Sequence, residues 1–558
     1  MKRSLVIALI LFISNLAIAQ KQLYYTNPIL SGFYPDPSIC KAGDDYYMTT
    51  SSFAYFPGLP IFHSKDLVNW KQLGHAIDRA EQMDFNGAGV SRGLFAPAIS
   101  YHKGLFYIVC TQIDKLGNFV ITAKDPKGPW SNPVALPQVN GIDPSLFFDK
   151  DDKAYIVYNS IPPDNKPLYS GHRTIRMYEF DWRNLKVTGE EKLIVNGGID
   201  ISKNPVWIEA PHILNKDGWY YLICAEGGTG YNHSEVVFRS KEVWGPYIPY
   251  ENNPILTQRH LDKNRPNPIT TTGHADFVET KDGKWYAVFL GCRPYEDDHY
   301  NIGRETFMAP VEWKDGWPHI LEGNETVQYQ YPVPMPAVTK KVNNPFGGSA
   351  HFKDQFDHEK LNDRFMFLRT VKEPWYSLTE KKGYLRINLR EETCGEKLNP
   401  SFIAFRQQNH RAEAFTSLQF SGRSENEKAG MAIFQSETHF YYLCKSVEND
   451  IPVIQLYEST KDSSMKLIIS HSIENYPAEL KLKIEARNSE YFFYYSKDGK
   501  NWTYMIKKVV DGKFLSTKTA GGFVGCVFAL YATSLGRESS AKAFYDRFEY
   551  KGDDGVYK

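Results

Sequence analysis

The stretch Asp217-Gly218-Trp219-Tyr220-Tyr221-Leu222 joins a tight turn to an aromatic-rich strand, and it decides the fold because its pattern recurs. A turn of charged or glycine residues followed by such a strand occurs five times in the first three hundred residues. The tyrosines of these strands lie 48 to 66 residues apart, at positions 47, 107, 155, 220 and 286. Each interval has room for about four short strands, and such a period is typical of a β-propeller. We therefore predict five blades.

The predicted domains follow the extent of this repeat. Helix signals are poor and strand signals are strong, so we predict an all-β chain with a five-bladed propeller over residues 20–337. Prolines at positions 332, 334 and 336 end the repeat, because proline fixes φ and removes a backbone donor. Residues 338–349 are predicted to form an extended connector. Strands without the repeat fill residues 350–558 and predict a β-sandwich of the concanavalin-like jelly-roll type.

Composition and charge exclude several classes of function. The chain has 65 basic and 65 acidic residues, and this balance argues against a nucleic-acid partner. Its seven cysteines are scattered without metal-type spacing, so we predict buried free thiols. No later apolar run approaches the roughly 18 residues that a membrane span needs. We predict no membrane insertion, no obligate protein partner and no required cofactor.

The first 19 residues have the features of a secretory signal peptide. Lys2 and Arg3 form a positive region, residues 5–13 form an apolar one, and Ala17-Ile18-Ala19 is a cleavage pattern. We expect a mature chain that starts at Gln20. The protein should then be exported, and periplasmic in a cell with two membranes.

Three carboxylates occupy the same place in different repeats. Asp36-Pro37-Ser38, Asp143-Pro144-Ser145 and Glu209-Ala210-Pro211-His212 each begin 11 or 12 residues before a strand tyrosine. A single Asp-Pro often does no more than open a turn. A radial repeat, however, gathers equivalent positions around one axis, so we predict that these acids share one cavity. Close carboxylates repel, and a neutral acid beside an ionised base is what glycoside hydrolysis needs.

Several motifs around these carboxylates resemble family 43 of the glycoside hydrolases. The similarity covers essentially the whole propeller, in residues 27–38, 43–47, 63–70, 141–145, 209–212, 272–276 and 303–306. The C-terminal region is similar to the sandwich of the β-xylosidase and α-L-arabinofuranosidase branch, in residues 375–378, 429–431 and 543–550. In that branch the sandwich covers one edge of the active-site mouth.

The resemblance implies hydrolysis with inversion and gives each carboxylate a role. Asp36 would be the general base that activates water. Glu209 would be the general acid that protonates the glycosidic oxygen, and Asp143 would raise the pKa of that acid and orient it.

The resemblance also implies four substrate-binding residues. Arg304 would reach sugar hydroxyls and a carboxylate in the pocket, unless it only pairs with Glu305 at the surface. Phe53 and Phe95 would lie beside the terminal sugar, or pack in the core instead. His274 is considered separately, because its equivalent has two roles within the family.

In part of the family, the equivalent of His274 ligates a central Ca²⁺ directly or through water. Hard cations prefer oxygen ligands, so a histidine is an unusual partner for Ca²⁺. We therefore predict no metal ligands here, and any Ca²⁺ would be structural. His274 is expected to hydrogen-bond near Asp143.

The chain departs from the family pattern in Leu94-Phe95-Ala96-Pro97-Ala98, where Trp-Ala-Pro-His is more usual. Phe95 replaces a tryptophan and Ala98 replaces a histidine. We expect both changes to alter the wall beside the terminal sugar and to make room for a pentose other than xylose.

The leading hypothesis is an exo-acting glycosidase that releases terminal α-L-arabinofuranose from side chains of xyloglucan or arabinoxylan. A β-D-xylosidase acting on xylo-oligosaccharides is the close alternative. A sugar-binding propeller without catalysis, with the sandwich as a carbohydrate-binding module, is an alternative of another class. A further one is a retaining five-bladed enzyme that uses its N-terminal Asp36 as nucleophile.

Overall fold

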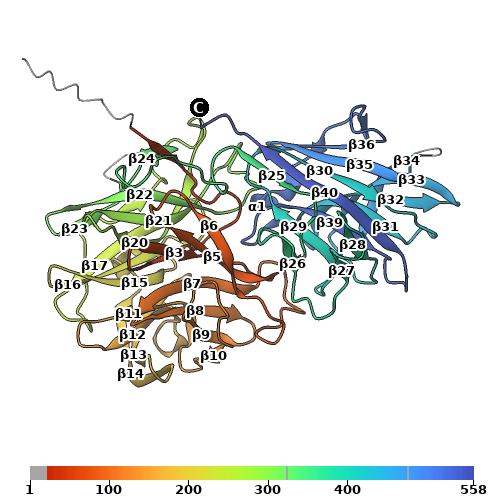
Figure 1. Ribbon diagram of the computed structural model, residues 1–558. Helices are drawn as coiled ribbons and strands as arrows, with labels where there is room; N and C mark the ends of the chain where they lie inside the picture. The colour runs from red at the N-terminus through yellow and green to blue at the C-terminus, as the bar shows by residue number, and fades with distance from the viewer. Residues whose placement is uncertain (1–21, 322–324, 474–476, 558) are drawn as a thin grey trace, which may run out of the picture.

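The computed structural model describes residues 22–321, 325–473 and 477–557, and Figure 1 shows it as two β-rich bodies side by side. The predicted signal peptide lies outside the described residues. The prediction of an all-β propeller followed by a concanavalin-like sandwich is confirmed. The single α-helix in the described ranges is α1 (Thr517–Ala520). No helix within those ranges has the length and apolarity that a bilayer crossing needs.

Four four-stranded antiparallel sheets and one five-stranded one form the blades of the propeller. Blade 1 contains β2 (Ser38–Ala42), β3 (Asp45–Thr49), β5 (Gly58–Ser64) and β6 (Lys71–Ile77). Blade 2 contains β7 (Gly93–His102), β8 (Leu105–Ile113), β9 (Gly117–Ala123) and β10 (Val134–Ala135). Blade 3 contains β11 (Gly141–Phe148), β12 (Ala154–Ser160), β13 (Thr174–Asp181) and β14 (Lys186–Asn196).

Blades 4 and 5 complete the ring. Blade 4 contains β15 (Glu209–Lys216), β16 (Trp219–Glu226), β17 (Ser234–Ser240) and β18 (Ile248–Pro249), and β19 (Leu256–Thr257) also pairs with β17. Blade 5 contains β20 (Thr270–Glu279), β21 (Trp285–Cys292), β22 (Glu305–Lys314) and β23 (Trp317–His319). The strand β1 (Tyr24–Thr26) pairs with β24 (Gln330–Pro332), which brings the start of the described chain beside the end of the propeller.

Hydrogen bonds close the ring of blades where blade 5 meets blade 1. Asp276 in β20 accepts hydrogen bonds from the Ser38 hydroxyl at 2.8 Å and from the Ile39 backbone N–H at 2.9 Å. Asn27 also binds the Met308 backbone, with its amide accepting at 3.0 Å and donating at 2.9 Å. Long-range polar contacts of this kind satisfy buried backbone groups where no strand ladder can do so.

The sandwich is built from two large antiparallel sheets. One contains β25 (Ala350–Asp354), β27 (Tyr376–Ser377), β28 (Leu385–Asn388), β30 (Arg411–Gln419), β35 (Glu479–Arg487), β36 (Glu490–Ser496), β37 (Thr503–Tyr504), β38 (Val510–Asp511) and β40 (Lys542–Gly552). The other contains β26 (Met366–Leu368), β29 (Ser401–Arg406), β31 (Lys428–Ser436), β32 (His439–Glu448), β33 (Ile451–Ser459), β34 (Met465–Ser472), β39 (Val527–Thr533) and one further strand.

That further strand comes from the propeller. β4 (Tyr55–Phe56) pairs antiparallel with β26, so that Phe56 lies opposite Phe367 and Tyr55 opposite Leu368. One apolar cluster also runs across the boundary, with Phe56 and Phe119 from the propeller and Phe405 from the sandwich among its members. The two domains therefore share both a sheet and a hydrophobic core. Buried apolar area of this kind is the main favourable term in domain association.

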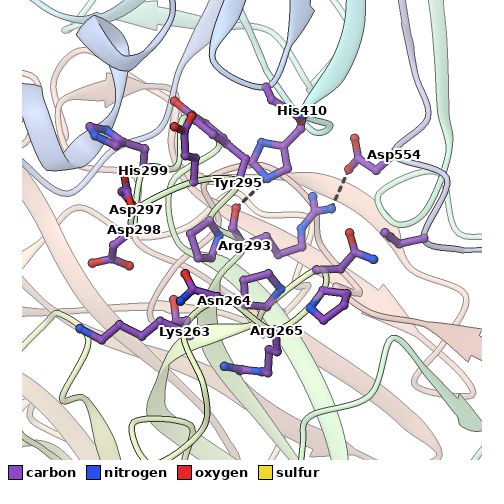
Figure 2. A pocket seen from close by; sticks show the side chains of 18 of the residues that line it. Lys263, Asn264, Arg265, Arg293, Tyr295, Asp297, Asp298, His299, His410 and Asp554 are labelled. Carbon is purple, nitrogen blue, oxygen red and sulfur yellow. Dashed lines mark hydrogen bonds and ion pairs between the residues drawn. The ribbon is translucent and has the colours of Figure 1, made fainter.

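Polar contacts complete the interface, and Figure 2 shows them around Arg293. The Arg293 guanidinium donates to both oxygens of Glu305 within the propeller, at 2.6 and 2.9 Å, and to Asp554 of the sandwich at 2.7 Å. His410 of the sandwich donates from Nε2 to the Arg293 carbonyl at 2.6 Å. A polar cavity of about 840 Å³ lies in this region. All seven cysteines of the chain are free thiols, as predicted.

Candidate active site

A cavity of about 450 Å³ gathers every site residue predicted from the sequence. Its lining includes Asp36, Phe53, Phe95, Asp143, Glu209, His274 and Arg304. Each of the five blades contributes at least one of these side chains. The larger cavity at the domain interface contains none of them. The predicted convergence of three carboxylates on the propeller axis is therefore present in the structure.

Irregular backbone at the innermost strands aims these side chains into the cavity. The β11 ladder shifts register between Ile142 and Ser145, and the β15 ladder shifts between Glu209 and His212. Asp143 itself has a left-handed backbone, with a φ of 53°. A bulge turns a side chain out of the alternation of its strand, and proline is tolerated there because the ladder is already broken. The proline that follows these acids in the sequence is therefore explained by the bulge.

Asp36 is held in its ionised form by Arg304 and Ser51, and His274 lies nearby. Arg304 donates from Nη1 to Asp36 Oδ1 at 2.7 Å, and Ser51 donates from its hydroxyl to Oδ2 at 2.5 Å. His274 Nδ1 lies 3.7 Å from Oδ1. Burial by itself would raise the pKa of Asp36, but the Arg304 charge and the Ser51 hydrogen bond lower it below its usual value. Asp36 is thus a buried carboxylate that stays charged near neutral pH.

Glu209 has the opposite protonation. Burial, followed by repulsion from Asp36, raises the pKa of Glu209 to about 7, although Arg304 and Arg173 act against the rise. Burial also raises the pKa of Asp143 well above its usual range, with Glu209 and Asp36 adding to the effect. Asp143 and Glu209 therefore retain a proton between them in the range where Asp36 is charged.

Asp143 is positioned to influence Glu209 through the backbone as well as through charge. Its Oδ2 accepts a hydrogen bond from the backbone N–H of Ala210 at 3.3 Å. Ala210 directly follows Glu209 and has a φ of 50°. Asp143 therefore fixes the strained turn that presents the neighbouring acid.

His274 does not lie where the sequence placed it. It was expected beside Asp143, but its imidazole is paired with Asp36 instead. Burial lowers the pKa of His274 to about 3, so the ring is neutral. Within the ranges that the structure describes, no group of three His, Cys, Asp or Glu side chains is arranged to hold a metal ion.

Arg304 is buried and lines the cavity, and it does not form the surface ion pair with Glu305 that was the alternative. Its partner is Asp36, whereas Glu305 pairs with Arg293. The Arg304 guanidinium carbon lies 5.9 Å from the ring centroid of Phe53 and 5.4 Å from that of Phe523. Arg304 Nε has no hydrogen-bond partner among the described residues.

Phe523 is a site residue that the sequence did not reveal, and it comes from the sandwich. Its ring is stacked on Phe53 with centroids 6.2 Å apart and an interplanar angle of 16°. It meets Phe95 edge-on at 5.7 Å. Three phenylalanines from two domains therefore form one apolar wall of the cavity. Phe523 lies in a loop without periodicity, so pattern analysis had no signal to find it.

Close backbone contact sets the place of the Phe523 loop. Gly525 lies against the loop that carries Arg304, and a Cβ at this position would be 1.9 Å from the Ile302 carbonyl oxygen. The Cys526 N–H also donates to the Asn301 carbonyl at 2.7 Å. Only glycine permits so close an approach. The sandwich loop is therefore fixed against the propeller loop that supplies Arg304.

One expected change of the cavity wall is corrected by the structure. Phe95 lines the cavity, as predicted, but Ala98 packs in the hydrophobic core with Tyr107 and Val109. The Phe95–Ala98 segment spans a register shift in β7, so the two residues do not share an environment. The loss of histidine at position 98 therefore does not alter the wall directly. Arg173 and Trp207 also line the cavity and were not predicted from the sequence.

Fold and site together define the class of protein. A propeller whose axis ends in one neutral and one ionised carboxyl group is built as a glycoside hydrolase. The chain matches the model described as glycosyl hydrolases family 43 over residues 25–318. It matches the model described as the β-xylosidase C-terminal concanavalin A-like domain over residues 353–551. The chain belongs to glycoside hydrolase family 43.

Similar proteins match over almost their whole length. A xylosidase/arabinosidase of Butyrivibrio fibrisolvens is 39% identical over 94% of this chain and 98% of its own. The non-reducing end alpha-L-arabinofuranosidase BoGH43B of Bacteroides ovatus is 35% identical over 98% of both chains. A solved structure named Bacteroides ovatus Xyloglucan PUL GH43B superposes with a TM-score of 0.83 at 35% identity, covering 95% of this chain and 99% of that one.

Proposed function

We propose that the protein is an inverting, exo-acting glycosidase that releases terminal α-L-arabinofuranose from side chains of xyloglucan or arabinoxylan oligosaccharides. The observation that carries this proposal is the opposite protonation of Asp36 and Glu209 in one cavity. Membership of a hydrolase family argues against the alternative of a propeller that only binds sugar.

In the proposed mechanism the two carboxyl groups move one proton each. Asp36 accepts a proton from a water molecule, whose oxygen attacks the anomeric carbon. Glu209 gives its proton to the glycosidic oxygen as the bond to the anomeric carbon breaks. The products are the free sugar with inverted configuration and the shortened oligosaccharide. Proton exchange with solvent then restores ionised Asp36 and neutral Glu209.

The remaining residues hold the reacting groups and the sugar. Arg304 keeps Asp36 charged through its hydrogen bond to that carboxylate, and its guanidinium lines the cavity in which the sugar would bind. The wall formed by Phe53, Phe95 and Phe523 offers an apolar surface to the C–H face of the terminal sugar. Because the sandwich supplies part of this wall, the cavity is a pocket that suits removal of a terminal sugar rather than cleavage within a chain.

Arabinofuranose is favoured as the released sugar by two observations. The Bacteroides ovatus relative is named a non-reducing end alpha-L-arabinofuranosidase. Phe95, which lines the cavity, is smaller than the tryptophan more usual in the family pattern. β-D-Xylosidase activity is the second candidate, favoured by the name of the Butyrivibrio fibrisolvens relative, which includes both sugars.

Two measurements test the proposal. Values of kcat/KM for 4-nitrophenyl α-L-arabinofuranoside and β-D-xylopyranoside, taken side by side, should favour the arabinofuranoside. A higher value for the xylopyranoside would replace the first candidate by the second. NMR of the first-formed sugar should show inverted configuration. A retained anomer would make Asp36 a nucleophile and would remove its proposed role as a base.

We also propose that residues 1–19 direct export and that the mature enzyme works in the periplasm. Their charge and apolar pattern support this proposal. Mass spectrometry of the mature protein from a cell fraction should find an N-terminus at Gln20. An intact Met1 in the cytoplasmic fraction would contradict it.

A further inference from the structure

Arg173 and Trp207 form a stacked pair on the rim of the active-site cavity. The guanidinium carbon of Arg173 lies 3.9 Å from the ring centroid of Trp207. Both side chains line the cavity and both are partly exposed. Trp207 precedes Glu209 by two residues, and Arg173 lies close enough to Glu209 for the two charges to influence each other. The pair is therefore adjacent to the proposed acid.

The backbone at Trp207 is strained and firmly held. Its φ is 53°, a left-handed conformation that a bulky aromatic residue rarely adopts. The Trp207 N–H donates to the Gly171 carbonyl at 2.8 Å. Gly171 must lack a side chain, because a Cβ there would lie 2.8 Å from Val206 Cγ1 and 3.2 Å from Trp207 Cδ1. Strain that a structure maintains in this way is concentrated at functional sites.

Arg173 has hydrogen-bonding capacity that the protein does not use. No residue in the described ranges accepts a hydrogen bond from its guanidinium, which instead lies over the Trp207 ring and interacts with the charge of Glu209. A guanidinium carries five N–H donors in a fixed plane. In contrast, Arg304 and Arg92 on other parts of the wall each pair with a carboxylate. Arg173 is thus open to a ligand.

In the proposed mechanism Glu209 acts on the oxygen that lies between two sugar rings, so the cavity must hold a ring on each side of it. Asp36, Arg304 and the phenylalanine wall lie together at one end, where the released sugar is bound in the proposed mechanism. Glu209 protonates the oxygen that joins the released sugar to the leaving sugar. The leaving sugar must therefore lie on the other side of Glu209. Trp207 and Arg173 are both close to Glu209, Trp207 along the chain and Arg173 through the interaction of the two charges.

We propose that Arg173 and Trp207 bind the leaving sugar and so select oligosaccharides by the ring that carries the terminal residue. The inference rests on the proposed function of the same cavity. The indole offers an apolar surface to the C–H face of a pyranose, and the guanidinium donates to its hydroxyls. The ligand class is a neutral pyranose within a hemicellulose oligosaccharide, because the described rim presents a cation and an aromatic ring rather than a cluster of cations.

The test compares two substrates with the same terminal sugar and different leaving groups. α-L-Arabinofuranosyl fluoride leaves as fluoride and needs no leaving-sugar site, whereas an arabinofuranosyl xylo-oligosaccharide does. In Trp207→Ala and Arg173→Met, kcat/KM for the oligosaccharide should fall about 10- to 100-fold. The value for the fluoride should change by less than about threefold, because no contact with a leaving sugar is lost.

A matched control exists on the outer edge of blade 3. Arg183 stacks on Trp182 with its guanidinium carbon 4.0 Å from the ring, and neither residue lines the cavity. Trp182→Ala and Arg183→Met also remove a stacked arginine–tryptophan pair. They should nevertheless leave kcat/KM unchanged for both the fluoride and the oligosaccharide. Equal losses on fluoride and oligosaccharide in the Trp207 and Arg173 variants would show that the pair only supports Glu209, and would overturn the proposal. Unchanged rates on both substrates would overturn it as well.

The outcomes separate this inference from the proposed function. If the wild-type enzyme prefers xylosides, the arabinose assignment fails, and xylosyl fluoride and xylobiose test the pair in the same way. If the wild-type enzyme turns over neither sugar, the proposed function and the pair fail together. A selective loss on either oligosaccharide supports the pair whichever pentose is released.

Discussion

The propeller and the sandwich contribute to one cavity in different ways. The propeller supplies Asp36, Asp143 and Glu209 from equivalent places in three blades, so its repeat itself brings the reacting groups together. The sandwich supplies Phe523 from a single loop before β39. The carboxylates proposed to react therefore come from the repeat of the propeller, whereas part of the wall proposed to contact the sugar comes from the second domain. Each prediction below separates these two contributions.

The largest effect should come from the propeller carboxylates. Asp36→Asn and Glu209→Gln should each reduce kcat on an oligosaccharide by about 10²–10⁴-fold, because each removes a proton-transfer step. Steady-state kinetics measures the loss, and circular dichroism confirms the fold. Arabinofuranosyl fluoride, whose leaving group needs no acid, should restore much of the rate in Glu209→Gln but not in Asp36→Asn. If the rate on the fluoride recovered to a similar extent in both variants, the assignment of Glu209 as the acid and Asp36 as the base would be wrong.

A smaller effect should come from the sandwich. Phe523→Ala removes a ring stacked on Phe53 and should lower kcat/KM about 10- to 100-fold, the equivalent of about 1.5–3 kcal/mol of lost contact. Phe415→Ala is the matched control, because Phe415 lies on β30 of the sandwich and does not line the cavity. If both variants behave as the wild type does, the sandwich contributes no wall to the working site.

The pH dependence of kcat/KM should be set by residues of the propeller alone. Glu209 must be protonated, so kcat/KM should fall about tenfold per unit once the pH rises above the Glu209 pKa of about 7. Asp36 must be ionised, and its lowered pKa places the loss of activity on the acid side below the usual aspartate range. Phe523→Ala should lower the whole profile without moving either limb. A shifted alkaline limb in that variant would mean that the sandwich also tunes Glu209.

The smallest effect concerns stability. The folded pKa of Glu209 is above its unfolded value, so its favourable contribution is present below that unfolded value and is lost as the pH rises through about 7. Glu209→Gln should therefore raise the free energy of unfolding at pH 8 by about 1–2 kcal/mol, and by much less at pH 5. Thermal melts at both pH values measure the difference. A variant that is less stable than the wild type at pH 8 would contradict the raised pKa.

The sequence predicted the propeller and its reacting groups because both depend on repetition. Turn and strand recur in each blade, and the Asp-Pro pairs at one place in that repeat correspond to bulges or turns beside the axis. The resemblance to family 43 then supplied Arg304, His274, Phe53 and Phe95, all of which line the cavity. Periodicity carries this information because equivalent positions in a radial repeat are neighbours in space.

The rest depends on contacts that no local pattern encodes. Phe523 reaches the cavity only because Gly525 lets two loops from different domains touch. The strained backbone of Trp207 depends on residues that are distant in sequence. The sequence around His274 likewise does not indicate that its partner in the fold is Asp36. The position of Ala98 was also misjudged, because the register shift in β7 separates it from Phe95.

The strand β4 has a consequence for how this enzyme can be divided. Only Ala54 separates Phe53 from the start of β4, which belongs to the propeller in sequence and to a sandwich sheet in space. A protein engineer who transplanted the propeller alone would leave an unpaired sheet edge on β26 and would release the segment that carries Phe53. Inheritance of the two domains as one unit follows from that shared edge, since neither half contains a finished binding pocket.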